Sequence, residues 1–60
     1  MVYQVIVDGN SIEVKASISH YSLEKDNRIR EQIICHFLDD EGAESVEIKT
    51  TAEEVRNLYK

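Results

Sequence analysis

Cys35 and His36 are neighbours whose side chains could do chemistry, since a thiol beside an imidazole can form a nucleophile or a metal site. His20 supplies a second imidazole, but no Cys-x-x-Cys or His-x-x-x-His spacing accompanies these residues. If residues 29–38 are extended, neighbouring side chains point to opposite faces, so this thiol and imidazole cannot act together. We therefore expect no metal site, no cofactor and no catalytic residue.

Acidic residues form a second group that could bind a ligand. Asp39-Asp40-Glu41 with Glu44 resembles a calcium loop only superficially, because acids at alternate positions around a central glycine are missing. Residues 31–60 hold eight acids against three cations, so the net charge of −5 arises in this half of the chain. An acidic inhibitor or nucleic-acid mimic that binds a basic partner is therefore an alternative function. Its surface would comprise Asp39, Asp40, Glu41, Glu44, Glu47, Glu53 and Glu54.

Basic residues gather only around Lys25, Arg28 and Arg30. Binding to DNA or RNA depends on clustered cations that displace counterions from phosphates, and a net acidic chain repels that polymer. We do not expect a nucleic-acid partner. Weak nucleic-acid binding through these three residues remains a further alternative.

The size of the chain favours association with another protein. Sixty residues make one small domain, 1–60, and a core of this size supplies only about 3–5 kcal/mol unless something else contributes. A lone cysteine excludes an internal disulfide, which leaves a partner chain as the expected supplement. The lone cysteine, with no leader pattern at Met1 and no apolar run of membrane-spanning length, predicts a cytoplasmic protein.

The first half of the chain predicts a β-hairpin. In VYQVIVDGNSIEVKASI, apolar and polar residues alternate on both sides of Asp8-Gly9-Asn10, which is typical of two half-buried strands. A turn at Gly9-Asn10 pairs Val7 with Ile12 and gathers the apolar residues on one face.

Residues 30–49 allow two interpretations. As a helix, Ile29, Ile33 and Phe37 recur at every fourth position, but Asp26 and Arg30 interrupt the apolar arc. As a strand, residues 29–38 pair with 44–50 through a turn that ends at Gly42, and one sheet face becomes almost wholly apolar. We favour the strand because the turns then agree with the hydrophobic pattern. The last segment, about 52–59, predicts a short helix with a capping box from Thr51 to Glu54.

The expected fold is α+β: a four-stranded antiparallel meander (about 2–7, 11–23, 29–38 and 44–50) with a C-terminal helix. One terminal helix cannot cover both faces of this sheet, so a second apolar face stays open. We expect a non-enzymatic protein–protein interaction module that homodimerises through that face as an accessory or regulatory protein, with no small-molecule substrate. The predicted interaction surface is Tyr21, Leu23, Ile29, Ile33, Cys35 and Phe37.

Overall fold

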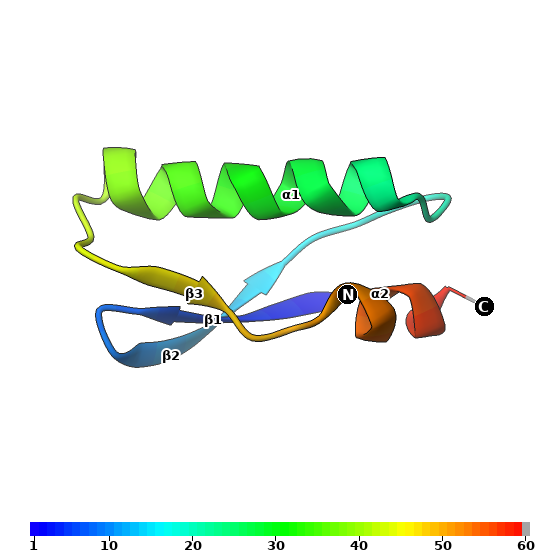
Figure 1. Ribbon diagram of the computed structural model, residues 1–60, viewed down its shortest axis with the longest axis horizontal. Helices are drawn as coiled ribbons and strands as arrows, with labels where there is room; N and C mark the ends of the chain where they lie inside the picture. Colours follow the sequence, from blue (N-terminus) through cyan, green and yellow to red (C-terminus); the bar gives the residue numbers. More distant parts are fainter. Residues whose placement is uncertain (60) are drawn as a thin grey trace.

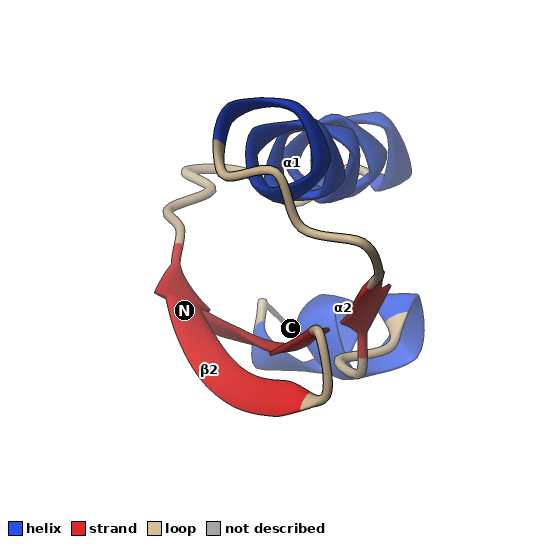
Figure 2. Cartoon of the chain, turned by 90° about the vertical axis from the view of Figure 1, so that its left-hand side faces the viewer, coloured by secondary structure: helices blue, strands red, loops and turns tan. Residues whose placement is uncertain are grey.

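The fold is a three-stranded antiparallel sheet with a long helix across one face. A computed structural model describes residues 1–59. Its elements are β1 (Val2–Val7), β2 (Asn10–Lys15), α1 (Leu23–Cys35), a π-helical extension η1 (His36–Asp40), β3 (Val46–Ile48) and α2 (Ala52–Leu58). The strand order is β2-β1-β3 (Figure 1), and the sheet curves beneath α1 (Figure 2). The predicted α+β class is confirmed, whereas the fourth strand does not form.

The hairpin is present, but its turn lies one residue earlier than predicted. Asp8 and Gly9 have φ of 49° and 83°, so both central positions are left-handed, as a type I′ turn requires. Val7 therefore pairs with Asn10 and Val5 with Ile12. The shift of two positions in the pairing keeps each residue on its predicted face, because side chains alternate with period two.

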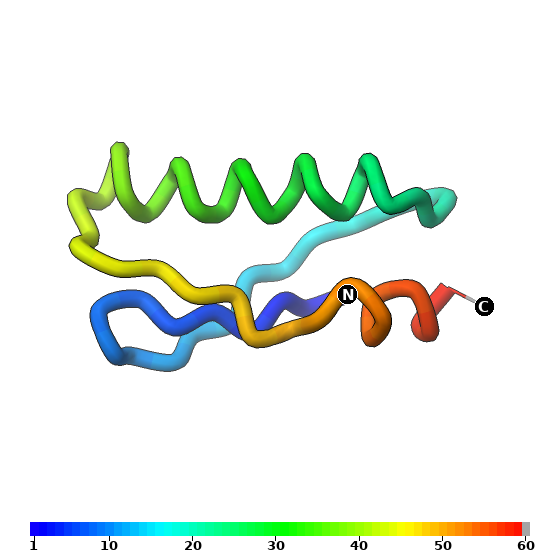
Figure 3. Tube along the Cα trace, in the orientation of Figure 1, coloured from blue at the N-terminus to red at the C-terminus, as the bar shows by residue number. Residues whose placement is uncertain are grey.

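The second strand is shorter than predicted. The predicted strand 11–23 is confirmed only over its first residues, since β2 ends at Lys15. Residues 16–22 then cross from the end of β2 to the start of α1, as the tube in Figure 3 shows. Ile18, in this connection, is only 6% exposed and belongs to the core.

The predicted strand at residues 29–38 is wrong, because these residues are helical. Ser22 begins α1 by accepting a hydrogen bond from the Lys25 amide through its side chain at 3.1 Å. The helix continues through η1 and ends near Gly42, whose φ is 70°. The Ala43 amide then donates to the Phe37 carbonyl at 2.8 Å, which closes the helix end. Gly42 is thus left-handed as expected, but it ends a helix instead of shaping a hairpin.

A buried polar cluster explains why α1 tolerates charge on its inner side. Asp26 is fully buried, and its carboxylate accepts a hydrogen bond from the Tyr3 hydroxyl of β1. Arg30, one helical turn later, donates to the same carboxylate at 2.9 Å and lies 5.3 Å from the centre of the Tyr3 ring. Asp26 and Arg30, whose charges were taken as evidence against a helix, therefore connect α1 to Tyr3 of the sheet.

The last strand and helix lie close to their predicted positions. β3 falls inside the predicted range 44–50, but it pairs with β1, placing Ile48 opposite Val5. Beyond β3, the buried Thr50 accepts a hydrogen bond from the Gln4 amide at 2.9 Å. α2 begins with Thr51, whose side chain accepts from the Glu54 amide at 3.2 Å, as one half of the predicted capping box requires.

Candidate functional site: a groove along the edge of the sheet

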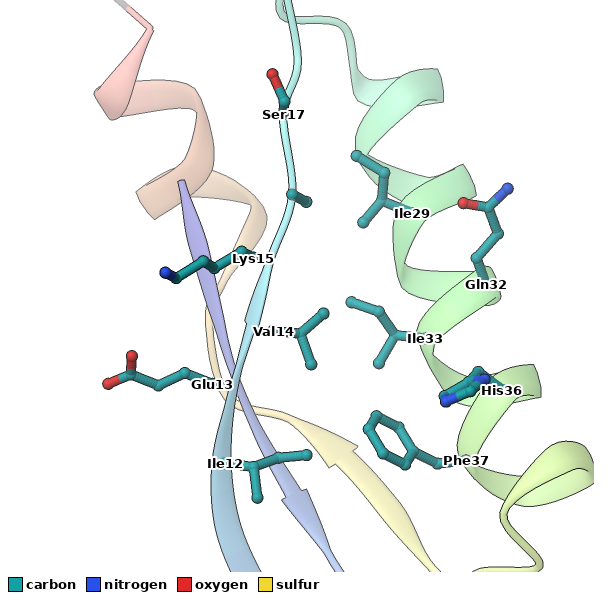
Figure 4. Close-up of a pocket in the computed structure, with 11 residues that line it drawn as sticks. Ile12, Glu13, Val14, Lys15, Ser17, Ile29, Gln32, Ile33, His36 and Phe37 are labelled. Carbon is teal, nitrogen blue, oxygen red and sulfur yellow. The ribbon is translucent and has the colours of Figure 1, made fainter.

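The candidate site is an open groove of about 620 Å³ between β2 and the helix formed by α1 and η1, here called the β2–α1 groove. Figure 4 shows Ile12 and Val14 of β2 pointing across it toward Ile33 and Phe37 of the helix. Glu13 and Lys15 lie on its rim and point away from it. The remaining lining residues are Ala16, Ser17, Ile29, Gln32 and His36.

Helical spacing places three apolar side chains on the wall that α1 and η1 contribute. Ile29, Ile33 and Phe37 are four residues apart, so they lie on one face of the helix. Ile33 is 6% exposed and belongs to the core, while Ile29 and Phe37 are half-buried. The wall is therefore anchored at its centre and accessible on both sides of it.

The opposite wall carries the free edge of the sheet. Met1 and Ala16 exchange backbone hydrogen bonds of 2.9 and 3.0 Å, which fixes the alternation along the hairpin. Val14 and Ile12 then bond to β1, whereas the amides and carbonyls of Ser11, Glu13 and Lys15 point outward. In the described part of the chain no backbone bond is found for these outward groups. β2 thus offers hydrogen-bond donors and acceptors directly beside an apolar groove.

The face of the sheet away from α1 is polar. Gln4, Glu13, Lys15 and Glu47 are exposed there, and two apolar residues, Val2 and Ile6, are half-buried among them. The predicted second apolar face depended on residues 29–38 being extended, so the helix removes that surface. The dimer interface that was predicted on this second apolar face therefore has no corresponding surface in the structure.

The residues of the predicted interaction surface are divided among three places. Ile29, Ile33 and Phe37 line the β2–α1 groove. Tyr21 and Leu23 line a second groove of about 550 Å³ between the start of α1 and α2, where the Tyr21 and Tyr59 rings stack with centroids 6.3 Å apart. Cys35 is an exposed free thiol on α1, outside both grooves.

The acidic residues of the alternative surface are all exposed but do not form one patch. Asp39, Asp40, Glu41 and Glu44 lie around the end of η1, at one end of a molecule 35 Å long. Glu53 and Glu54 lie in the first turn of α2 near the opposite end (Figure 1), and Glu47 lies on β3 between them. A basic partner would have to span much of the molecule to contact both groups.

The basic residues of the third alternative are also separated. Lys25 donates to the His20 carbonyl at 3.0 Å, and the exposed Arg28 lies 3.5 Å from Glu24. Arg30 is mostly buried against Asp26, with 19% of its side chain exposed. Because Arg30 faces the core, only Lys25 and Arg28 of these three are exposed to solvent, and each already contacts another group of the protein.

The structure places His36 beside two carboxylates and leaves Cys35 as an exposed free thiol. The His36 ring contacts two exposed carboxylates, Asp40 at 3.2 Å and Glu41 at 3.6 Å. Across residues 1–59, no group of three or more His, Cys, Asp or Glu side chains could hold a metal ion. Over the same residues, no helix has the length and apolar character needed to cross a membrane.

Comparison with family models, with curated proteins and with solved structures found no match for this chain. The function is therefore argued from geometry.

Sequence reasoning found one wall of the groove and missed the other. Ile12, Val14 and Ala16 were assigned to the sheet face that the C-terminal helix was expected to cover, and a third strand was expected to occupy the edge of β2 that is open in the structure. The signal that could have exposed this edge was the Ser22 cap with Glu24 and Asp26 behind it, which is typical of a helix start.

Proposed function

We propose that this protein is a non-catalytic protein–protein interaction module that binds an extended segment along β2, with the β2–α1 groove receiving its apolar side chains. The observation that carries the proposal is the free edge of β2 running beside the apolar groove. A strand that adds to a sheet edge gains affinity from main-chain hydrogen bonds, and alternate side chains enter a neighbouring pocket.

The exposed edge of β2 supports this proposal because it has few of the features that block strand addition. Natural sheets protect their edges with short strands, bulges, prolines or inward-pointing charges. β2 has six residues in unbroken register with β1, and it contains no proline. The other edge strand, β3, has only three residues. Lys15 is the one cation on the β2 edge, and it points away from the groove.

The composition of the groove favours a peptide over a reacting substrate. Its walls are aliphatic and aromatic, and the polar side chains lie on its rim (Figure 4). Peptide-binding grooves use apolar walls for affinity and a few polar groups for orientation. Here the outward amides and carbonyls of Ser11, Glu13 and Lys15 supply that orientation.

The test is selection of extended peptides from a display library at low protein concentration, followed by NMR mapping of the selected peptides. The Glu13→Pro variant removes an outward amide without breaking a bond to β1, and Glu13→Ala removes the same side chain while keeping that amide. We expect resonances of β2 and α1 to shift, with binding lost in the proline variant and kept in the alanine variant. Equal binding by the two variants, or shifts confined to another surface, would refute the proposal.

A further inference from the structure

We infer that the segment bound along β2 is β2 of a second copy of this chain, paired antiparallel about Val14. This inference rests on the proposed function, since it names the occupant of the same edge and groove. Its basis is the sequence Ser11-Ile12-Glu13-Val14-Lys15-Ala16-Ser17, which is nearly symmetric in character about its centre.

Charge complementarity favours this register. When two β2 strands pair antiparallel about Val14, Glu13 of each copy lies opposite Lys15 of the other. Glu13 and Lys15 are also the residues whose amides and carbonyls point outward, so the oppositely charged residues exchange backbone hydrogen bonds as well. Centring the pair on Glu13 or on Lys15 would instead place like charges opposite each other, which is destabilising.

The apolar face of the paired strands meets the groove. A two-fold axis perpendicular to the sheet keeps both copies of α1 on the same side of one continuous sheet. Val14 then lies opposite Val14, and Ile12 opposite the small Ala16, so a large side chain faces a small one at each end of the pair. Ile12 and Val14 lie on the groove side of β2 in Figure 4, so the same side chains of the second copy would cover the open flank of the groove.

Charge exchange on β2 tests this pairing directly. Glu13→Lys and Lys15→Glu each place like charges opposite one another at both ends of the symmetric pair. We expect each variant to weaken the dimer by roughly 10- to 100-fold in dissociation constant. An equimolar mixture of the two variants restores opposite charges across the interface, so it should form a heterodimer as strong as the wild-type dimer. Sedimentation equilibrium measures all three samples.

The chain offers a matched control on the other edge. Glu47 and Lys49 have the same spacing as Glu13 and Lys15, are exposed, and belong to β3 and the residue after it. Glu47→Lys and Lys49→Glu change the net charge by the same amounts, yet they should leave the dimer unchanged. All four of these side chains are exposed, so we expect every variant to keep the fold. Far-ultraviolet circular dichroism of each variant checks this.

The outcomes separate this inference from the proposed function. A wild-type chain that stays monomeric at millimolar concentration overturns self-pairing, while peptides that still bind in the groove leave the proposed function standing. A dimer that ignores the β2 variants, or that responds to the β3 variants instead, also overturns the inference. Failure of the mixed variants to associate overturns the register about Val14.

Discussion

Replacing Asp26 by asparagine should remove much of the stability of this fold. The Asp26 carboxylate is fully buried and accepts hydrogen bonds from Tyr3 and from Arg30, the latter at 2.9 Å. Asp26→Asn keeps the shape of the side chain but turns an amide group toward the Arg30 guanidinium and removes its counter-charge. Breaking a buried ion pair on one side costs about 3–5 kcal/mol.

The lower end of that range applies here, because 19% of the Arg30 side chain is exposed and water can reach it. A loss of about 3 kcal/mol is most of what a core of this size supplies. It corresponds to a fall in Tm of about 12–24 °C for a domain of this length. Urea and thermal unfolding followed by circular dichroism measure both quantities.

Glu24→Gln provides the matched control. Glu24 lies in the same helix and contacts Arg28 at the same i, i+4 spacing, but both side chains are exposed. Because solvent screens such pairs, the control should leave the unfolding curve unchanged. If Asp26→Asn costs no more than Glu24→Gln, the buried cluster does not fasten α1 to the sheet.

A double substitution separates the pair from its two members. Asp26→Leu with Arg30→Met replaces both charges by apolar side chains of similar length. The double variant should lose far less free energy of unfolding than the sum of the losses in Asp26→Leu and in Arg30→Met, because it leaves neither charge buried without its partner. Additive losses would contradict the coupling seen in the geometry.

Three further predictions concern the helix start, the hairpin and pH. Ser22→Ala should lower the free energy of unfolding by about 1 kcal/mol, because the Ser22 side chain accepts a hydrogen bond from the Lys25 amide at 3.1 Å. Ser19→Ala, at an exposed serine, is the control in the same urea titration. Gly9→Ala should lower the free energy of unfolding by about 1–2 kcal/mol. The φ of Gly9 is 83° and no atom lies within 4 Å of the added carbon, so the loss is backbone strain alone. An unchanged midpoint in urea unfolding would contradict the left-handed turn. The pKa of Tyr3 is raised above its ordinary value of 10.0, mainly by burial and next by the hydrogen bond to Asp26. The folded state therefore holds the hydroxyl proton of Tyr3 more tightly than the unfolded state does. Stability should therefore be intact below about pH 10 and fall as pH rises further, and Tyr3→Phe should flatten that fall in urea titrations at each pH.

The sequence allows the hairpin and α2 to be predicted because their signals are local, whereas the strand predicted at 44–50 contains β3 but was paired with the wrong segment. Alternation of apolar residues around Asp8-Gly9 identifies two strands, and Thr51 followed by Glu54 identifies a helix start. The predicted turn at Gly9-Asn10 was wrong by one residue, since the two left-handed residues are Asp8 and Gly9. That error left the faces unchanged.

The helix α1 could not be predicted in the same way because its evidence is non-local. Asp26 and Arg30 look misplaced on an apolar arc until the Tyr3 hydroxyl, 23 positions from Asp26, is brought beside them. The branched residues around Ile33 and Ile34 favour a strand when they are considered alone. The tertiary contacts of Asp26 and Arg30 override this propensity. The same error prevented prediction of the β2–α1 groove, because a third strand paired with β2 would have covered the edge beside it.

β1, the first strand along this sequence, is the central strand of the sheet. β1 pairs on one side with β2, its neighbour along the chain, and on the other side with β3, which begins only at Val46. Without β3, the edge of β1 would be exposed over Val5–Val7, in place of the three-residue edge that β3 presents. β3 therefore covers an edge of β1 that would otherwise be open to pairing with another chain.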